Sequence, residues 1–496
     1  MLFNSLSFII FFPIVLLIYF IIPARVRYLW LLVTSYYFYM CWNAKYALLL
    51  LASTAITYAA AMLMERWRDR VALKKVMVGI SLFLNLGILF LFKYFNFAFE
   101  TVEKVFGRLG VTFEAPVFDL LLPVGISFYI FQAIGYTIDI YREKLAPEKN
   151  FFRYALFVSF FPQLVAGPIE RSTNLLPQFR DLDKRKLWDT TRIQKGAVVM
   201  LYGYFLKMIL ADRIAILVDT VFDPMAYSTY QGITVIVAAM LFSVQIYCDF
   251  AGYSYIALGA ARIMGFELMH NFNMPYLARN VKDFWDRWHL SLSTWFRDYL
   301  YFPLGGSRKG TVRKYINIFI VFLVSGLWHG ASWHYVAWGV IHGIMRIAGE
   351  ATQKLRETLY VKLHFQRDTF AVRLWQTVCT FAMVTVAWVF FRAESVNQSL
   401  EMIKSMFTVY NPWVLTDGTL FTLGLDAKEW NVLMLALLIL VMVDVLRYKK
   451  LQLTEWFMTQ NLWFRWMVFY AGIMAVVIFG VYGAQYDATQ FIYFQF

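Results

Sequence analysis

The chain contains few of the residues on which many enzymes and most soluble folds depend. Its 496 residues include only three cysteines and six histidines, and charged residues make up only 16%. Cys41, Cys248 and Cys379 stand far apart in apolar sequence. They form neither a disulfide framework nor a metal-binding pattern, and we expect them to be buried as small hydrophobic side chains.

Polar residues are too scarce to cover a large soluble core. Hydrophobic residues make up 60% of the sequence, whereas soluble domains are about half apolar. A bilayer span takes about 20 apolar residues. Several apolar runs reach or approach this length, such as 6–22, 76–95 and 468–482. The sequence therefore predicts an all-α polytopic integral membrane protein, with about 10–12 membrane helices and re-entrant or interfacial helices around a central chamber.

Cleavable signals, repeats and linkers are also lacking. The first seven residues have no basic region or cleavage site, so we expect the first membrane helix to be retained. The net charge of +14 is spread over short basic clusters between apolar runs, which is typical of cytoplasmic loops and does not indicate nucleic-acid binding. Counting these clusters places both termini outside the cytoplasm, and we expect residues 1–496 to form one membrane domain.

The spans are regular in the first and last thirds of the chain and irregular between them. In the first third we expect a fourth helix to end near Phe95, a loop at 96–119 and a fifth helix at 120–141. In the middle, 151–183 is broken by proline and glycine, and 277–306 is amphipathic. Irregular or charged backbone at membrane depth survives only inside protein or around a cavity, so these two stretches are expected to form the chamber.

All six histidines lie in one fifth of the chain, and His329 is the most informative of them. It follows a long apolar run, where a titratable group is by default a functional-site hypothesis. Histidine is well suited to proton transfer near neutral pH. The alternative is a packed histidine that is hydrogen-bonded to nearby backbone. His334 and His342 lack the further ligands of a metal site, so no metal is expected.

A second candidate lies in the polar stretch 281–298. On a single helix of 100° per residue, several polar side chains share one face. They are Lys282, Asp286, His289, Ser293 and Arg297. The stretch is either an interfacial amphipathic helix with its charges in water or a helix that lines a wet cavity with His289 inside.

Two carboxylates and one glycine-rich loop complete the candidates. Asp139 and Asp249 lie in apolar helices and need partners. They would either orient a histidine or form ion pairs with Arg142 or Arg171, and structural pairing is favoured. The loop 305–310 is rich in glycine and basic residues but lacks the Walker spacing, so we interpret it as an ordinary cytoplasmic loop. No nucleophile-elbow or nucleotide-binding motif is present, which leaves histidine to carry any chemistry.

Six segments resemble the membrane-bound O-acyltransferase family. They are 122–132 (LPVGISFYIFQ), 161–171 (FPQLVAGPIER), 247–254 (YCDFAGYS), 271–276 (NFNMPY), 283–301 and 326–330 (GLWHG). They extend over most of the chain in the family's order. The loop 304–310 (LGGSRKG) and the terminal 491–496 (FIYFQF) resemble the alginate O-acetyltransferase branch more than the D-alanyl transfer branch.

The resemblance implies roles for individual residues. The family's invariant histidine corresponds to His329, and its second functional histidine to His289. Tyr255 departs from the alginate-type pattern, which usually has aspartate there, and leaves Asp249 as the nearest acid. Five further residues are expected to support the site or line its cavity: Asp286, Ser293, Arg297, Trp328 and Asn273.

The implied reaction is acyl transfer, most simply of acetyl, from cytoplasmic acyl-CoA towards an extracytoplasmic polysaccharide or cell-wall polymer. It takes place in the bacterial inner membrane, needs no bound cofactor and usually involves a separate extracellular transferase of the SGNH type. His329 would act as a general base and His289 would polarise the carbonyl; a covalent acyl-histidine is the alternative. The competing functions are D-alanyl transfer to teichoic acid, transport of a lipid-linked sugar and a non-catalytic role in secretion. Transport is less favoured because no inverted repeat is visible.

Overall fold

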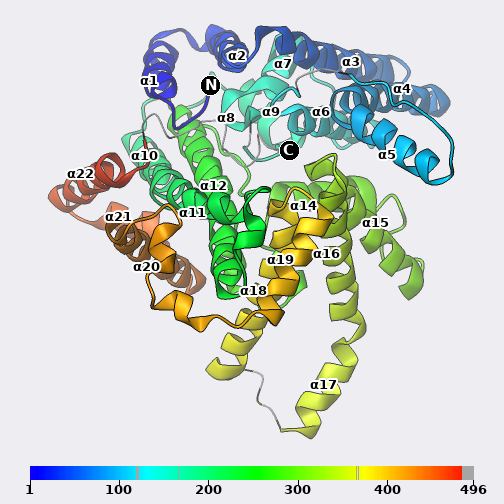
Figure 1. The fold of residues 1–496 in the computed structure, drawn as a ribbon. Helices are drawn as coiled ribbons and strands as arrows, with labels where there is room; N and C mark the ends of the chain where they lie inside the picture. The colour runs from blue at the N-terminus through cyan, green and yellow to red at the C-terminus, as the bar shows by residue number, and fades with distance from the viewer. Residues whose placement is uncertain (119–121, 166, 365, 367, 483–496) are drawn as a thin grey trace. The chain divides into compact units, whose positions relative to one another are not determined.

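The computed structural model describes residues 1–118, 122–165, 167–364, 366 and 368–482. All the secondary-structure elements within these ranges are helices. The chain divides into two compact units, which Figure 1 draws together. Unit 1 comprises residues 1–200 and 256–269, and unit 2 comprises 201–255 and 270–496. The expected all-α membrane fold is confirmed, whereas the expectation of one domain stays a prediction.

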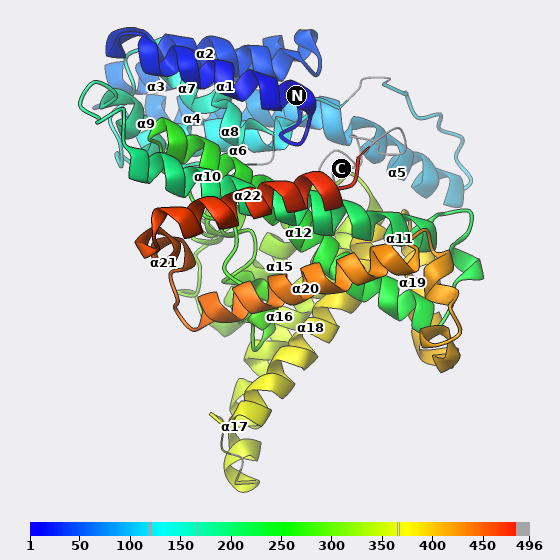
Figure 2. The ribbon, with the colours of Figure 1, turned by 90° about the vertical axis from the view of Figure 1, so that its left-hand side faces the viewer.

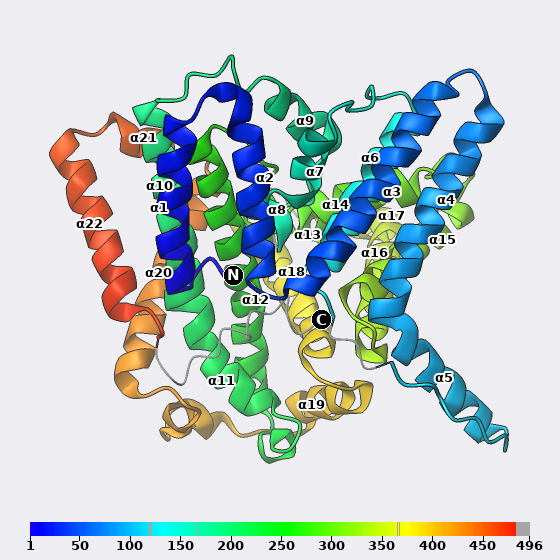
Figure 3. The same ribbon diagram turned by 90° about the horizontal axis from the view of Figure 1, so that it is seen from above.

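Unit 1 contains most of the blue and cyan helices of Figure 1. They are α1 (Leu6–Ile21), α2 (Ala24–Met40), η1 (Ala44–Tyr46), α3 (Ala47–Arg66), α4 (Val71–Leu89), η2 (Phe90–Tyr94), α5 (Phe95–Arg108), α6 (Ile126–Tyr141), α7 (Phe151–Ser159), α8 (Phe161–Leu164), α9 (Ser172–Arg180) and most of α10 (Thr190–Tyr204). Helices α3, α4 and α6 pack against one another, and α2 packs against α7 (Figure 3).

Buried hydroxyl and amide groups join the helices of unit 1. The Ser53 hydroxyl on α3 donates to Asn85 on α4 at 2.5 Å. The hydroxyls of Thr57 on α3 and Tyr154 on α7 share a hydrogen bond of 2.6 Å. Small polar residues allow helices to approach closely in lipid and form bonds for which hydrocarbon offers no substitute. These contacts fix which faces of the apolar helices meet.

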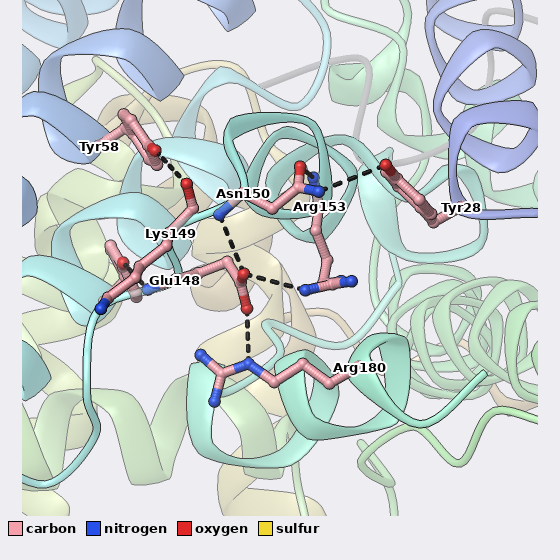
Figure 4. A network of polar contacts seen from close by, with 8 residues as sticks. Tyr28, Tyr58, Glu148, Lys149, Asn150, Arg153 and Arg180 are labelled. Carbon is pink, nitrogen blue, oxygen red and sulfur yellow. Dashed lines mark hydrogen bonds and ion pairs between the residues drawn. The ribbon is translucent and has the colours of Figure 1, made fainter. Parts of the chain in front are cut away.

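A buried carboxylate fastens the loop between α6 and α7, as Figure 4 shows. Glu148 is 3% exposed. Its Oε1 accepts from Arg153 at 3.1 Å, and its Oε2 accepts from Arg180 Nε at 2.6 Å. The two guanidinium groups offset the free energy that the carboxylate loses when it leaves water. An isolated carboxylate at this depth would be strongly destabilising. Through these two bonds the loop is tied to both α7 and α9, which lie in the stretch 151–183 that proline and glycine interrupt.

Unit 2 contains the middle and C-terminal helices. Its helices are the end of α10, η3 (Phe205–Ala211), α11 (Asp212–Phe222), η4 (Tyr227–Thr229), most of α12 (Ile233–Met264), η5 (Pro275–Leu277), α13 (Val281–Trp285), α14 (Leu290–Phe296), η6 (Arg297–Tyr301), α15 (Thr311–His329), α16 (Trp333–Ala351), α17 (Gln353–Lys362), α18 (Phe370–Arg392), α19 (Val396–Thr408), η7 (Pro412–Leu415), η8 (Thr419–Thr422), α20 (Ala427–Tyr448), α21 (Leu453–Thr459) and α22 (Leu462–Phe479). Helices α15 and α16 pack along each other, α16 also contacts α18, and both α20 and α22 contact the π-helical η3 (Figure 2).

Seven helical stretches of the described chain are long and apolar enough to cross a bilayer. They are Ala44–Arg66, Val71–Arg108, Ile233–Met264, Thr311–His329, Phe370–Arg392, Ala427–Tyr448 and Leu462–Phe479. The apolar α1 is shorter, at 16 residues. The chain is therefore a polytopic membrane protein, and the expected 10–12 crossings stay a prediction. The C-terminal segment 491–496 and the start of the expected fifth helix lie outside the described residues.

Two expectations for unit 1 were wrong. The fourth helix does not end near Phe95, because η2 and α5 extend the helical path to Arg108. The charges at 100, 103 and 104 suggested a loop, yet the segment is helical, and the tilted rings of Phe95 and Phe99 pack together with centroids 4.5 Å apart. Cys41, the residue after the end of α2, is exposed, and Cys379 in unit 2 is partly exposed, whereas Cys248 is buried as expected.

Candidate active site

Two histidines from different segments of unit 2 lie close together in its interior. His329 is the last residue of α15, and His289 directly precedes α14. Their ring centroids are 6.4 Å apart. His289 is fully buried and His329 is 4% exposed. A group held by both imidazoles would therefore be shielded from bulk water.

The expectation of one continuous helix over 281–298 was wrong. The helix stops at Trp285 and starts again at Leu290, and His289 between them has a left-handed backbone with φ of 45°. This break turns His289 into the interior, while Lys282 and Asp286 form an exposed ion pair of 3.0 Å. The polar face drawn on a single helix therefore does not exist, because a non-glycine residue in the left-handed region ends the helical path.

Asn271 holds this break in place, and the sequence interpretation missed it. Its carbonyl oxygen accepts from the Leu290 N–H at 2.9 Å. Its side chain donates to Ser254 at 3.0 Å and accepts from the Ser291 hydroxyl at 2.6 Å. Asn273, selected from the same motif, is exposed instead. The sequence motif contains both asparagines, but it does not indicate that Asn271 is the one that points into the interior.

Aromatic rings surround the two imidazoles. The Trp328 ring lies 5.9 Å from His289 and 4.9 Å from His329, between centroids. Trp338 and Phe391 lie 5.1 and 5.3 Å from His329. This dry environment lowers the pKa of His289 to about 3, because burial disfavours its charged form. His289 is therefore neutral at physiological pH and has one N–H donor and one acceptor.

His342 extends the cluster behind Trp338. The rings of Trp338 and His342 lie 4.9 Å apart. The indole N–H of Trp285 donates to His342 Nδ1 at 3.3 Å. Because indole only donates, Nδ1 is the acceptor, and the proton of a neutral ring is on Nε2. Within the described ranges, no three His, Cys, Asp or Glu side chains are grouped to hold a metal ion.

Ser293 and Arg297 take part in local contacts. The Ser293 hydroxyl donates to the Trp288 carbonyl at 3.2 Å. Arg297 is exposed and pairs with Asp298 at 3.0 Å. The structure thus brings together His289, Trp328 and His329 from the predicted set, whereas Asp286, Arg297 and Asn273 are at the surface of unit 2.

Asp249 belongs to a buried ion cluster that the sequence interpretation identified only in part. Lys207 Nζ lies 2.6 Å from Asp249 Oδ1 and 2.8 Å from Asp212 Oδ1. All three residues are at most 6% exposed. Structural pairing of Asp249 was favoured, and Lys207 is its partner. The signal was available, because Lys207 is a lone cation in the apolar run 204–210.

Tyr255 and Asp139 have defined partners too. The Tyr255 hydroxyl accepts from Arg447 Nη1 at 2.6 Å, and the guanidinium also lies over its ring at 5.2 Å. In unit 1, Asp139 accepts from the Ser172 hydroxyl and lies 3.5 Å from Lys144 Nζ. Tyr255 therefore joins α12 to α20, and Asp139 joins α6 to α9.

The segment that carries both histidines matches a known family. Residues 142–393 match the model of MBOAT, the membrane-bound O-acyltransferase family. The chain belongs to this family and is an O-acyltransferase.

Its relatives include the probable alginate O-acetylase AlgI of Azotobacter vinelandii, with 34% identity over 90% of this chain and 85% of that protein. The peptidoglycan O-acetyltransferase of Helicobacter pylori is 34% identical over 82% of this chain and 80% of that protein. The teichoic acid D-alanyltransferase of Streptococcus thermophilus is 28% identical over 48% of this chain and 60% of that protein. The resemblance to the alginate-type branch is thereby confirmed.

Proposed function

We propose that the protein transfers an acetyl group from cytoplasmic acetyl-CoA across the bacterial inner membrane for O-acetylation of an extracytoplasmic polysaccharide or cell-wall polymer. The observation that carries the proposal is the pair of buried imidazoles, His289 and His329, 6.4 Å apart within aromatic walls. The names of the relatives, an alginate O-acetylase and a peptidoglycan O-acetyltransferase, support acetyl as the group and a glycan polymer as the final acceptor.

The reaction needs a base, a polarising donor and a dry site. The acceptor hydroxyl oxygen attacks the thioester carbonyl carbon, and His329 takes the hydroxyl proton. The new C–O bond forms, the C–S bond breaks, and the proton passes to the departing CoA thiolate. A base of this kind contributes roughly 10²–10⁴-fold in rate. Neutral His289 donates its N–H to the carbonyl oxygen as negative charge develops there.

The position of His329 along α15 suits transfer to an outside acceptor. The basic residues at 308–314 lie just before and in the first turn of this helix, and the positive-inside rule assigns them to the cytoplasm. From the first residue of the helix, Thr311, to His329 the axial rise is about 27 Å at 1.5 Å per residue. This length is close to the ~30 Å thickness of the hydrocarbon core. Acyl-CoA would reach the site from the cytoplasm, and the acceptor from the other side. The same rule places both termini outside.

A separate extracytoplasmic transferase of the SGNH type fits this division of labour. The structure describes only helices and their connecting segments in this chain, whereas a polymer acceptor is large and lies outside the membrane. We infer that the membrane protein delivers the acetyl group and that the partner places it on sugar hydroxyls. D-alanyl transfer to teichoic acid is less favoured, because that relative matches under half of this chain.

The test uses purified protein in nanodiscs with acetyl-labelled acetyl-CoA and a soluble SGNH partner. Label transfer is compared between wild type, His329→Asn and His364→Asn. His364 is an exposed histidine with φ of 51°, a conformation that asparagine tolerates. We expect transfer to be lost only in His329→Asn. Equal transfer in all three proteins would remove His329 from the reaction, and no transfer from any acyl thioester would favour a transporter or scaffold.

A further inference from the structure

A second site in unit 2 is a cavity of about 960 Å³. It lies among the start of α13, the start of α15, the end of α16, α17 and the first half of α18. The described residues that line it do not include His289 or His329. The acyl-transfer mechanism therefore leaves this cavity without a role.

Basic side chains from four of these segments converge on the cavity. They are Arg279, Lys282, Lys314, Arg346 and Arg356. Only two acidic residues, Glu350 and Glu357, line it with them, and Lys282 is already paired with Asp286, which lies outside the lining. Glu350 is shared, because it pairs with Lys314 and accepts from Arg346 Nη1 at 3.0 Å. One carboxylate between two cations leaves excess positive charge, which favours an anionic ligand.

The wall formed by α18 is apolar and faces outward. Trp375 and Met383 line the cavity and are 67% and 44% exposed. Leu374 and Val378, their neighbours on the helix, are exposed as well. Helix α18 is one of the seven candidate spans, so side chains exposed on it face lipid acyl chains. The cavity is thus cationic inside and bordered by a surface that lies against the bilayer.

We propose that this cavity binds the headgroup of an anionic phospholipid from the cytoplasmic leaflet. Arg279, Arg346 and Arg356 would take the phosphate oxygens, and the acyl chains would lie along Trp375 and Met383 on α18. Basic pockets between membrane helices on the cytoplasmic side suit such headgroups, and guanidinium pairs well with phosphate. The assignment to this leaflet rests on the proposed orientation, in which the basic segment before Lys314 is cytoplasmic.

A soluble phosphate ester such as the nucleotide part of acyl-CoA shares the phosphate chemistry. The lipid-facing α18 wall favours the phospholipid, because a nucleotide gains nothing from exposed Trp375 and Met383 next to acyl chains. Binding of a lipid here does not require acyl transfer. A failure of the proposed catalytic function therefore leaves the lipid measurement unaffected, and the two outcomes can be told apart.

The experiment measures lipid selectivity of the full-length protein. Wild type is delipidated in detergent and titrated with phosphatidylglycerol or phosphatidylcholine of identical chains, and bound lipid is counted by native mass spectrometry. The cavity variant is Arg279→Gln/Arg356→Gln, and the matched control is Arg308→Gln/Lys309→Gln, which removes two exposed charges outside the cavity lining. We expect the preference for phosphatidylglycerol to fall about tenfold or more in the cavity variant only.

Three results would overturn the proposal. They are equal retention of both lipids by wild type, an equal loss in the control, and displacement of the lipid by 3′-phospho-ADP with the same sensitivity to the cavity substitutions. The last result would assign the cavity to the acyl donor. Size-exclusion chromatography checks folding, and the single variant Arg356→Gln, at an exposed position on α17, replaces the double variant should that variant aggregate.

Discussion

His289 and His329 lie 6.4 Å apart between ring centroids although they belong to different helical segments. The left-handed turn before α14 brings the first histidine inward, and the end of α15 presents the second. Because Trp328 contacts both rings, the space around them is narrow and dry. This arrangement supports the proposed mechanism, in which one imidazole polarises the thioester carbonyl and the other accepts the proton of the attacking hydroxyl.

The two histidines should differ in how much activity they contribute. We expect His329→Gln to lower kcat roughly 10²–10⁴-fold, because it removes the proposed general base. His289→Gln should lower it less, because the glutamine amide can still donate to the carbonyl oxygen. Single-turnover rates of thioester cleavage in nanodiscs measure both variants. A larger loss in His289→Gln than in His329→Gln would reverse the assigned roles.

Acid sensitivity provides a separate test of the burial of His289. Its pKa is lowered to about 3 in the folded protein, whereas an unfolded histidine titrates near 6.5. Between these values the unfolded state binds more protons, so stability falls as the pH drops from 6.5 towards 3. The Tm of wild type should therefore drop more between pH 7 and pH 5 than that of His289→Gln. Equal drops would mean that His289 is hydrated and not buried as described.

The crossing of α15 and α16 should tolerate no added methyl group. A Cβ at Gly326 would overlap the carbonyl oxygen of Tyr335, and one at Gly339 would overlap that of Phe322. Since backbone cannot yield cheaply, Gly326→Ala and Gly339→Ala should each destabilise the protein by about 1–3 kcal/mol and displace His329. Gly349→Ala is the control on α16, because nothing lies within 4 Å of its Cβ position. Thermal stability in detergent and acyl transfer together measure the effect.

Composition and hydropathy were sufficient to predict the membrane helices. They did not predict the break in the helix at His289, which depends on the backbone conformation of a single residue. Apolar runs predicted the membrane helices, and the histidine after such a run made His329 a candidate, which the structure places in the interior beside His289. The interpretation of 281–298 failed because periodicity assumes a continuous helix, and one residue with φ of 45° at His289 ends it. Lys207 was overlooked because its partners Asp212 and Asp249 become neighbours only when η3, α11 and α12 pack.

Removal of the Lys207 ammonium should be strongly destabilising. Lys207→Met leaves Asp212 and Asp249 buried without their shared cation, and breaking a buried pair in this way costs about 3–5 kcal/mol. The triple variant that adds Asp212→Asn and Asp249→Asn should recover much of the loss, because no charge is then left uncompensated. Lys282→Met, which breaks an exposed pair, should change stability by less than about 1 kcal/mol. A triple variant as unstable as Lys207→Met would show that packing, and not charge, dominates there.

Asn271 and Asn273 offer the sharpest comparison, because they share one motif and differ in burial. Asn271→Ala removes the side-chain bonds to Ser254 and Ser291 and leaves both hydroxyls without this partner next to the turn at His289. We expect a loss of about 1–3 kcal/mol in stability and a larger proportional loss in kcat than in binding of the thioester, because His289 moves. Asn273→Ala, at an exposed position, should leave both nearly unchanged. Measuring kcat, KM and Tm for the pair separates positioning from folding: Asn271 positions His289 only if kcat falls in the fraction of the protein that remains folded.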